Sequence, residues 1–134
     1  DFNSEEEKKF QEMQKGYEKS KANFEKYGSL VSLQFPEYDG KPNFTKFLDI
    51  LGGHIIGGNW VGTISSKEYP KAFDMKVQTN KDIDDTVVSI SYQGNPFYFI
   101  ADTASYNWCG GYIDGIIMMY EPVSRIVLYT FDFS

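Results

Sequence analysis

This chain of 134 residues has few of the residues on which common kinds of site are built. It contains one cysteine, Cys109, one histidine, His54, and one arginine, Arg125. A single cysteine cannot form a disulfide within the chain, which excludes the disulfide-rich secreted scaffolds. The chain also lacks the set of Cys and His residues that a zinc site needs. Bidentate arginine clamps on phosphates or carboxylates can come from one position at most.

Basic charge is scarce as well. Lys and Arg number 13 against 19 Asp and Glu, so the formal net charge is −6. This balance argues against binding to a nucleic-acid backbone or to an anionic membrane surface. No run of 18 apolar residues is present, so we expect no membrane span. The chain begins at Asp1 rather than Met, and either an artificial boundary or a removed signal segment would explain this start. We slightly favour an exported (periplasmic or secreted) protein.

Aromatic residues, in contrast, are abundant. Eleven Phe, ten Tyr and two Trp make up 17% of the chain. Such side chains suit a pleated, half-buried surface and so favour β-sheet. The length fits one domain that buries its own core. We therefore predict a single α+β domain over residues 1–134.

Residues 4–27 have the pattern of an amphipathic helix. Ser4 and Glu7 form a capping box at its start, and Gly28 suits the left-handed residue that ends a helix. One stripe of the helix carries apolar residues at helical spacing: Phe10, Met13, Tyr17, Phe24 and Tyr27. We expect this stripe to cover a sheet or the mouth of a barrel.

The remaining elements follow from the hydrophobic period. Residues 30–35 alternate and predict a short strand that ends at Pro36, and the spacing of apolar residues predicts a second, short helix at 43–51. An antiparallel β region is predicted over 58–133. Its six strands are expected at 60–64, 73–79, 87–92, 97–101, 112–120 and 125–133, joined mostly by short turns.

The tripeptide Gly58-Asn59-Trp60, at the start of the first of these strands, resembles the beginning of a lipocalin or related calycin barrel. The resemblance covers about residues 52–133. It implies a small barrel with Trp60 at its base and Arg125 stacked on Trp60 as a cation–π contact. That family has eight strands and no long N-terminal helix. The alternative is therefore a cystatin-like or NTF2-like sheet wrapped around a helix.

Residues with catalytic or metal-binding potential do not form a convincing set. Cys109 and His54 could form a thiolate–imidazole pair, but a buried cysteine and a hydrogen-bonded histidine explain them as well. The aspartates of the loop 80–85 could hold Ca²⁺, but their spacing does not match the calcium-loop pattern. We predict no catalytic residues, no metal and no cofactor.

The first functional hypothesis is a non-catalytic protein that binds an apolar or aromatic small molecule inside the barrel. The alternative is a protein-interaction module, such as an inhibitor, immunity or secreted effector protein, with an acidic and aromatic-rich surface. In the loop 102–111, large aromatics either form a binding rim or fold inward. The predicted ligand-binding residues are Phe73, Met75, Tyr92, Phe97, Phe99, Tyr106, Trp108 and Tyr112.

Overall fold

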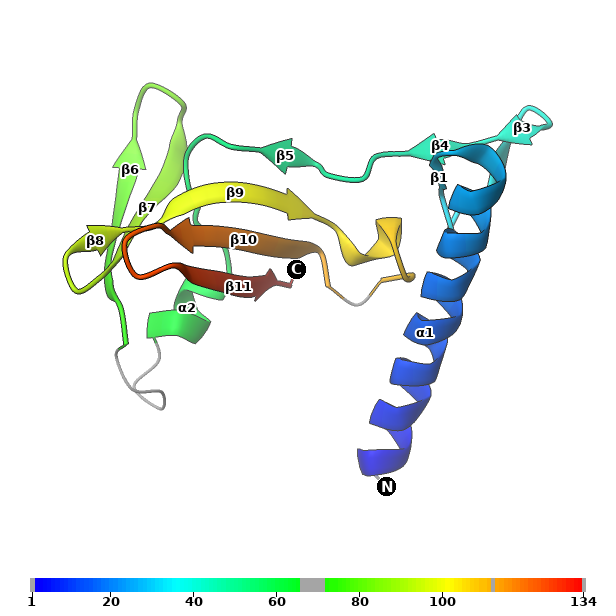
Figure 1. The fold of residues 1–134 in the computed structure, drawn as a ribbon, viewed down its shortest axis with the longest axis horizontal. Coiled ribbons are helices and arrows are strands. Elements are labelled where there is room, and N and C mark those ends of the chain that lie inside the picture. Colours follow the sequence, from blue (N-terminus) through cyan, green and yellow to red (C-terminus); the bar gives the residue numbers. More distant parts are fainter. Residues whose placement is uncertain (1, 66–71, 112, 134) are drawn as a thin grey trace. The chain divides into compact units, whose positions relative to one another are not determined.

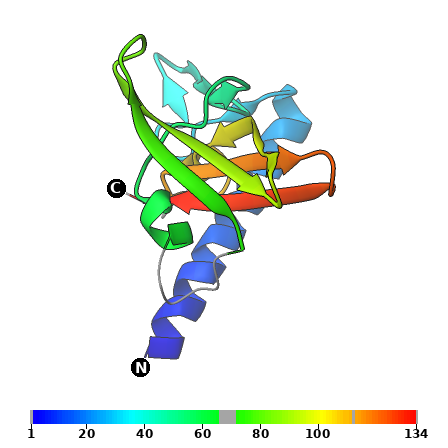
Figure 2. The same ribbon diagram turned by 90° about the vertical axis from the view of Figure 1, so that its left-hand side faces the viewer.

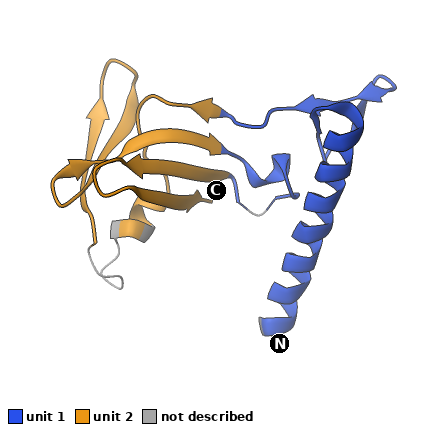
Figure 3. Ribbon diagram, viewed as in Figure 1, with its two compact units in different colours: residues 1–49, 103–114 blue, residues 50–102, 115–134 orange. Residues whose placement is uncertain are grey.

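The computed structural model describes residues 2–65, 72–111 and 113–133 (Figures 1 and 2). The chain divides into two compact units, shown in Figure 3. The first unit comprises residues 1–49 and 103–114, and the second comprises residues 50–102 and 115–134. The single domain over 1–134 stays a prediction.

The first unit begins with the long helix α1, Phe2–Tyr27, which confirms the helix predicted at 4–27. Gly28 has a φ of 68°, and its N–H donates to the carbonyl oxygen of Phe24 at 2.8 Å. A left-handed residue in this position ends a helix and satisfies one of its last carbonyls. The helix α1 therefore ends at Gly28, as the sequence predicts.

Short strands complete the first unit. β1 (Leu30–Val31) pairs antiparallel with β4 (Phe44–Thr45), and β2 (Glu37–Tyr38) pairs with β3 (Lys41–Pro42). The turn η1 (Ser105–Asn107) also belongs to this unit. The strand predicted at 30–35 is limited to its first two residues, because the Phe35 N–H donates to the Ser32 hydroxyl and bends the chain.

The short helix predicted at 43–51 is wrong. This segment is extended and contains β4 and β5 (Ile50–Leu51). The carbonyl oxygen of Phe47 accepts hydrogen bonds from the Trp108 indole and the Thr103 hydroxyl. The Phe47 ring packs against Phe24 of α1. These contacts with distant residues override the local helical spacing.

The second unit consists of two antiparallel sheets and a short helix. One sheet has the strand order β11-β10-β9-β5, and the other has the order β6-β7-β8. Figure 2 shows the β6–β7 hairpin running across the strands of the first sheet. Their bounds are β6 Asp74–Asn80, β7 Asp85–Tyr92, β8 Asn95–Pro96, β9 Tyr98–Thr103, β10 Gly115–Glu121 and β11 Ile126–Asp132. The last five predicted strands are thus confirmed, apart from their ends and Tyr112, which lies outside the described residues.

The strand predicted at 60–64 is wrong, because these residues form the helix α2, Trp60–Ser65. The helix begins where the Trp60 N–H donates to Oδ1 of Asp132, at 3.2 Å. The Asn59 side chain donates to the carbonyl oxygen of Phe133. The tripeptide that suggested a first strand therefore fixes a helix start to the end of β11.

The core of the second unit lies between the two sheets and α2. Its buried members are Ile55, Trp60, Val88, Ile90, Phe97, Phe99, Ile117 and Met119. The α+β class is confirmed. No sheet formed by the described residues closes into a barrel. None of the described helices has the length and apolar character to cross a membrane.

Candidate functional site

The predicted ligand-binding residues fall into two groups. Five of them belong to the second unit, and Tyr106 and Trp108 belong to the first. Tyr112 lies outside the described residues. The five in the second unit are Phe73, Met75, Tyr92, Phe97 and Phe99.

These five side chains pack on one another and on the core. The Phe73 ring makes edge contacts with Tyr92 and Phe97, at centroid distances of 6.1 and 5.3 Å. Phe97 and Phe99 are buried. Both also line an open groove of about 360 Å³ together with residues 53–55 and 87–90. These contacts make the five residues part of the core of the second unit or its border, and their role in ligand binding stays a prediction.

Trp60 and Arg125 occupy different environments. The Trp60 ring is buried in the core, and its indole N–H donates to the carbonyl oxygen of Ile56 at 3.1 Å. Arg125 is exposed in the turn between β10 and β11, with a φ of 58°. The cation–π contact implied by the resemblance stays a prediction.

The first unit contains a different pocket, of about 220 Å³. One face of α1 supplies Tyr17, Ser20, Lys21 and Phe24, because positions three, four and seven apart lie on the same side of a helix. Leu30, Phe47 and Trp108 complete the lining. We call these seven residues the helix pocket.

The aromatic wall of the helix pocket is held in place by specific bonds. The Trp108 indole N–H is shared between the Thr103 hydroxyl, at 2.9 Å, and the carbonyl oxygen of Phe47, at 3.1 Å. Phe47 makes edge contacts with Trp108 at 5.3 Å and with Phe24 at 5.2 Å. Three rings in such edge-to-face contact form a wall with a defined orientation.

The loop behind this wall sits directly against α1. A Cβ added at Gly16 would lie 2.6 Å from the carbonyl carbon of Cys109 and still closer to its oxygen. The Asp49 carboxylate accepts the Ala104 N–H at 2.8 Å, which ties the loop to the segment after β4. The Thr45 hydroxyl donates to the buried Asn107 side chain at 3.0 Å. The loop 103–109 is thereby fixed on both sides.

Two polar side chains line the helix pocket. Ser20 is 1% exposed, and its hydroxyl has no hydrogen-bond partner among the described residues. Leaving a buried hydroxyl unpaired costs about 1–3 kcal/mol. Lys21 is exposed and carries the positive charge of the lining. The pocket is thus apolar and aromatic with one unsatisfied hydroxyl.

Sequence reasoning found Trp108 and missed most of the other members. The sequence predicts that the stripe with Tyr17 and Phe24 covers a sheet or the mouth of a barrel, and it predicts a helix that contains Phe47. One signal was present in the stripe itself. Ser20 lies on the same stripe between Tyr17 and Phe24. A hydroxyl in an otherwise apolar stripe indicates that a hydrogen-bond partner is needed at that point.

Cys109 does not have the surroundings of a nucleophile. Its thiol contacts the carbonyl oxygen of Ser105 at 3.3 Å, and burial raises the pKa of the thiol. A reactive cysteine needs a lowered pKa, usually from a nearby positive charge or a helix N-terminus. His54, the other member of the suggested pair, belongs to the second unit.

Comparison with protein-family models, with curated proteins and with solved structures finds no match to this chain.

Proposed function

We propose that this protein binds, without catalysis, a small molecule that carries a single ring, in the helix pocket. The observation that carries the proposal is the unpaired Ser20 hydroxyl beside a wall of three oriented aromatic rings. This keeps the predicted class of ligand, apolar or aromatic, and moves its place from a barrel interior to the face of α1.

The size of the pocket limits the ligand. An apolar protein cavity of about 150 Å³ accepts benzene. Pockets for drug-sized ligands begin at about 300 Å³. The helix pocket, at about 220 Å³, lies between these values. One ring with a small substituent fits this volume, and a fused three-ring or long-chain ligand does not.

The substituent is expected to form a hydrogen bond with Ser20. A hydroxyl can donate one bond and accept others. A phenolic or indole ligand would satisfy the orphan group and gain roughly 0.5–1.5 kcal/mol over a purely apolar ring of the same size. Phenol should therefore bind more tightly than toluene.

Titration with phenol, indole and toluene tests the proposal, with the indole N–H signal of Trp108 followed by NMR. We expect saturable shifts of this signal for all three probes. Ser20→Ala should remove the preference for phenol over toluene, a loss of up to about tenfold in phenol affinity. Ser89→Ala, the same change at an exposed position of the second unit, is the matched control and should leave the preference intact.

The absence of a saturable Trp108 shift for every probe, up to the solubility limit, would overturn the proposal. An unchanged preference of Ser20→Ala for phenol over toluene would distinguish the claim of a ring-binding site from the claim that the Ser20 hydroxyl binds the substituent. It would leave the ring site standing and remove the role of the hydroxyl.

The lipocalin-like barrel remains a proposal about the second unit. It is supported by the burial of Trp60 in one core with Ile117 and Met119 of the four-stranded sheet. A solved structure with backbone hydrogen bonds that join the β6-β7-β8 sheet to β11 would support closure. Two separate sheets would reject it.

The predicted alternative, a protein-interaction module, is also favoured by one observation. The second unit exposes aromatic side chains along β11, where Tyr129 is 58% and Phe131 is 44% exposed. Aromatic residues are enriched at the energetic centres of protein interfaces. Co-purification of one stoichiometric partner that is lost on changing Tyr129→Thr would support it, and retention of that partner would contradict it.

A further inference from the structure

Strand β7 borders an opening on one of its two sides in the second unit. On this side Val87 forms an isolated antiparallel bridge with Ile56, and the end of β7 pairs with β8. Between these two points the neighbouring segments diverge from β7, since they continue into β5 and β9, which pair with each other in the four-stranded sheet. This opening is the groove of about 360 Å³ that Phe97 and Phe99 line, and we call it the β7 groove.

Two main-chain groups of β7 point to this side without a partner. In an antiparallel strand, the N–H and the C=O of one residue point to the same side. The Val88 N–H donates to the carbonyl oxygen of Ile55 at 2.8 Å. Further along, the carbonyl oxygen of Ile90 accepts the Phe97 N–H at 2.9 Å. The Val88 carbonyl and the Ile90 N–H therefore face the groove as well, and neither forms a hydrogen bond with any of the described residues.

An unpaired donor and acceptor at this place are unusual. Val88 and Ile90 are buried members of the core, and the main-chain groups of buried residues are almost always paired. The two groups belong to residues on either side of Ser89 and point in the same direction. They therefore mark a place where a ligand with a matching acceptor and donor can bind.

The spacing of the two groups defines that ligand. An antiparallel residue placed opposite Ser89 would be preceded by a carbonyl that accepts the Ile90 N–H. It would be followed by an N–H that donates to the Val88 oxygen. The bonds on either side of this pair are already made by Ile55 and Phe97. The groove therefore offers the hydrogen bonds of one extended residue between two peptide groups.

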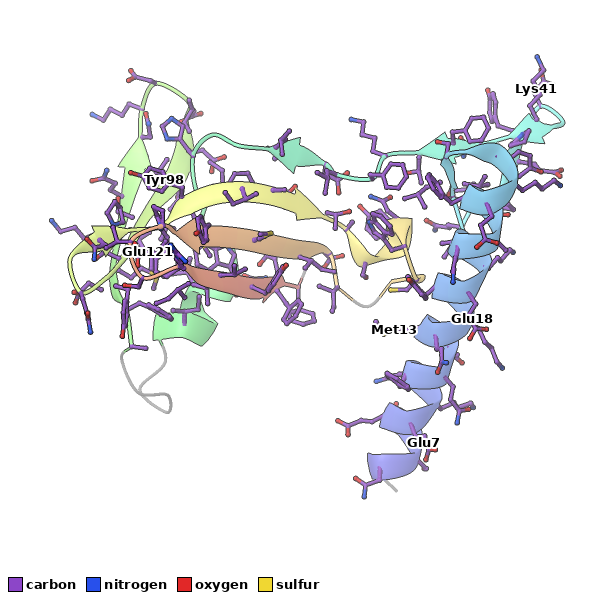
Figure 4. All side chains as sticks on the ribbon, viewed as in Figure 1. Glu7, Met13, Glu18, Lys41, Tyr98 and Glu121 are labelled. Atoms are coloured by element: carbon purple, nitrogen blue, oxygen red, sulfur yellow. The ribbon has the colours of Figure 1, made fainter. Side chains whose placement is uncertain are left out.

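The β7 groove has room for such a ligand. An apolar cavity of about 150 Å³ holds benzene, and the groove is more than twice as large, at about 360 Å³. Directly opposite residues of an antiparallel pair share one face, so the ligand side chain would lie beside the exposed Ser89 and away from the core. Tyr98, labelled in Figure 4, also lines the groove and is 57% exposed. The groove thus contacts the main chain of the ligand more than its side chain.

We propose that the β7 groove binds an extended peptide through its main chain, with one residue inserted opposite Ser89. The free Ile90 N–H and Val88 carbonyl are its hydrogen-bond partners, and the Tyr98 ring covers the inserted residue. This site lies within the second unit and is independent of the helix pocket.

Titration with N-acetylalanine N-methylamide, a single residue with a peptide group on each side, tests the proposal by NMR. We expect the Ile90 amide proton to shift downfield and to saturate in the millimolar range. N-acetylalanine methyl ester is the matched probe, because an oxygen replaces the N–H that would donate to Val88. The ester should bind about tenfold more weakly, since it loses one hydrogen bond.

A pair of tyrosine variants tests the place of binding. Tyr98→Ala should weaken binding of the N-methylamide several-fold, because it removes a ring from the wall of the groove. Tyr129→Ala is the matched control, since Tyr129 is 58% exposed but lies on β11, outside the lining of the groove. It should leave the affinity unchanged, and equal losses in the two variants would contradict the site.

Amide hydrogen exchange of the unmodified chain gives an independent readout, with Val88 as the internal control. After correction for intrinsic rates, the unpaired Ile90 N–H should exchange at least tenfold faster than the bonded Val88 N–H. A saturating concentration of the N-methylamide should slow it. Equal protection of the two amides without a probe would refute the opening beside β7. A fast Ile90 amide that does not respond to the probe, or equal affinities for the amide and the ester, overturns the proposal and leaves these groups to water.

Discussion

Gly16 offers a sharp test of the first unit, because two physical effects predict opposite signs for Gly16→Ala. Glycine in a helix interior costs about 1 kcal/mol relative to alanine. On helix propensity alone, the substitution should therefore stabilise the protein. The structure predicts the reverse, since the added Cβ would meet the backbone of Cys109.

The size of the effect follows from the distances. The new Cβ would lie 2.6 Å from the Cys109 carbonyl carbon and 3.1 Å from its Cα. Ordinary carbon contacts are about 3.5–4.0 Å. The neighbours are backbone atoms and cannot rotate away, so α1 and the loop must separate by about 1 Å. Overpacking of this kind costs roughly 1–3 kcal/mol, which leaves a net loss of about 1 kcal/mol after the helix gain.

Urea unfolding followed by circular dichroism measures this difference. Gly62→Ala in α2 is the matched control, because a Cβ there meets nothing within 4 Å. It should raise the free energy of unfolding by up to about 1 kcal/mol. The two variants should therefore differ by roughly 2 kcal/mol and in sign. A Gly16→Ala variant as stable as Gly62→Ala would refute the close approach of α1 and the loop.

Two further predictions concern the second unit. Burial alone would raise the pKa of Glu121, but the Ser124 and Val123 N–H groups, at 2.8 and 2.5 Å, lower it below its ordinary value. The ionised Glu121 side chain should thus stabilise the fold above about pH 4.3, and this stability is lost as the pH falls through its folded pKa. The urea midpoints of the unmodified chain and Glu121→Gln should therefore converge in acid. A difference between the midpoints that does not change with pH would contradict this. Asp132→Ala should lower the free energy of unfolding by about 1 kcal/mol, because the Trp60 N–H loses its acceptor at the start of α2. Asp132→Asn should recover part of that loss, and equal stability of all three proteins would reject the cap.

The parts of the fold that could be predicted are those in which local pattern and final environment agree. The period of α1, its stop at Gly28 and the alternation of β6, β7, β9, β10 and β11 are all set by neighbours in the sequence. The helix predicted at 43–51 is wrong because the Phe47 carbonyl is held by Trp108 and Thr103, which lie more than fifty positions away in the sequence. The strand predicted at 60–64 is wrong because the segment is a helix whose start depends on a bond to the distant Asp132.

The helix pocket was beyond prediction for a similar reason. The sequence identifies the apolar stripe of α1, but it does not indicate what the stripe meets. That contact depends on the loop 103–109, which Thr45 and Asp49 hold within the first unit from more than fifty positions away. Trp108 could be proposed because a large aromatic in a loop is unusual by itself. Phe47 and Leu30 look like ordinary core residues until their neighbours are known.

The distance along the chain between the two walls of the helix pocket has a consequence for synthesis. The wall supplied by α1 is made first, whereas Trp108 follows Phe47 by 61 positions. Closing so long a loop is slow compared with forming a helix. A nascent chain therefore displays Phe24 without its Phe47 and Trp108 neighbours until most of the protein has left the ribosome. During that interval the same aromatic face is a natural place for a chaperone to bind.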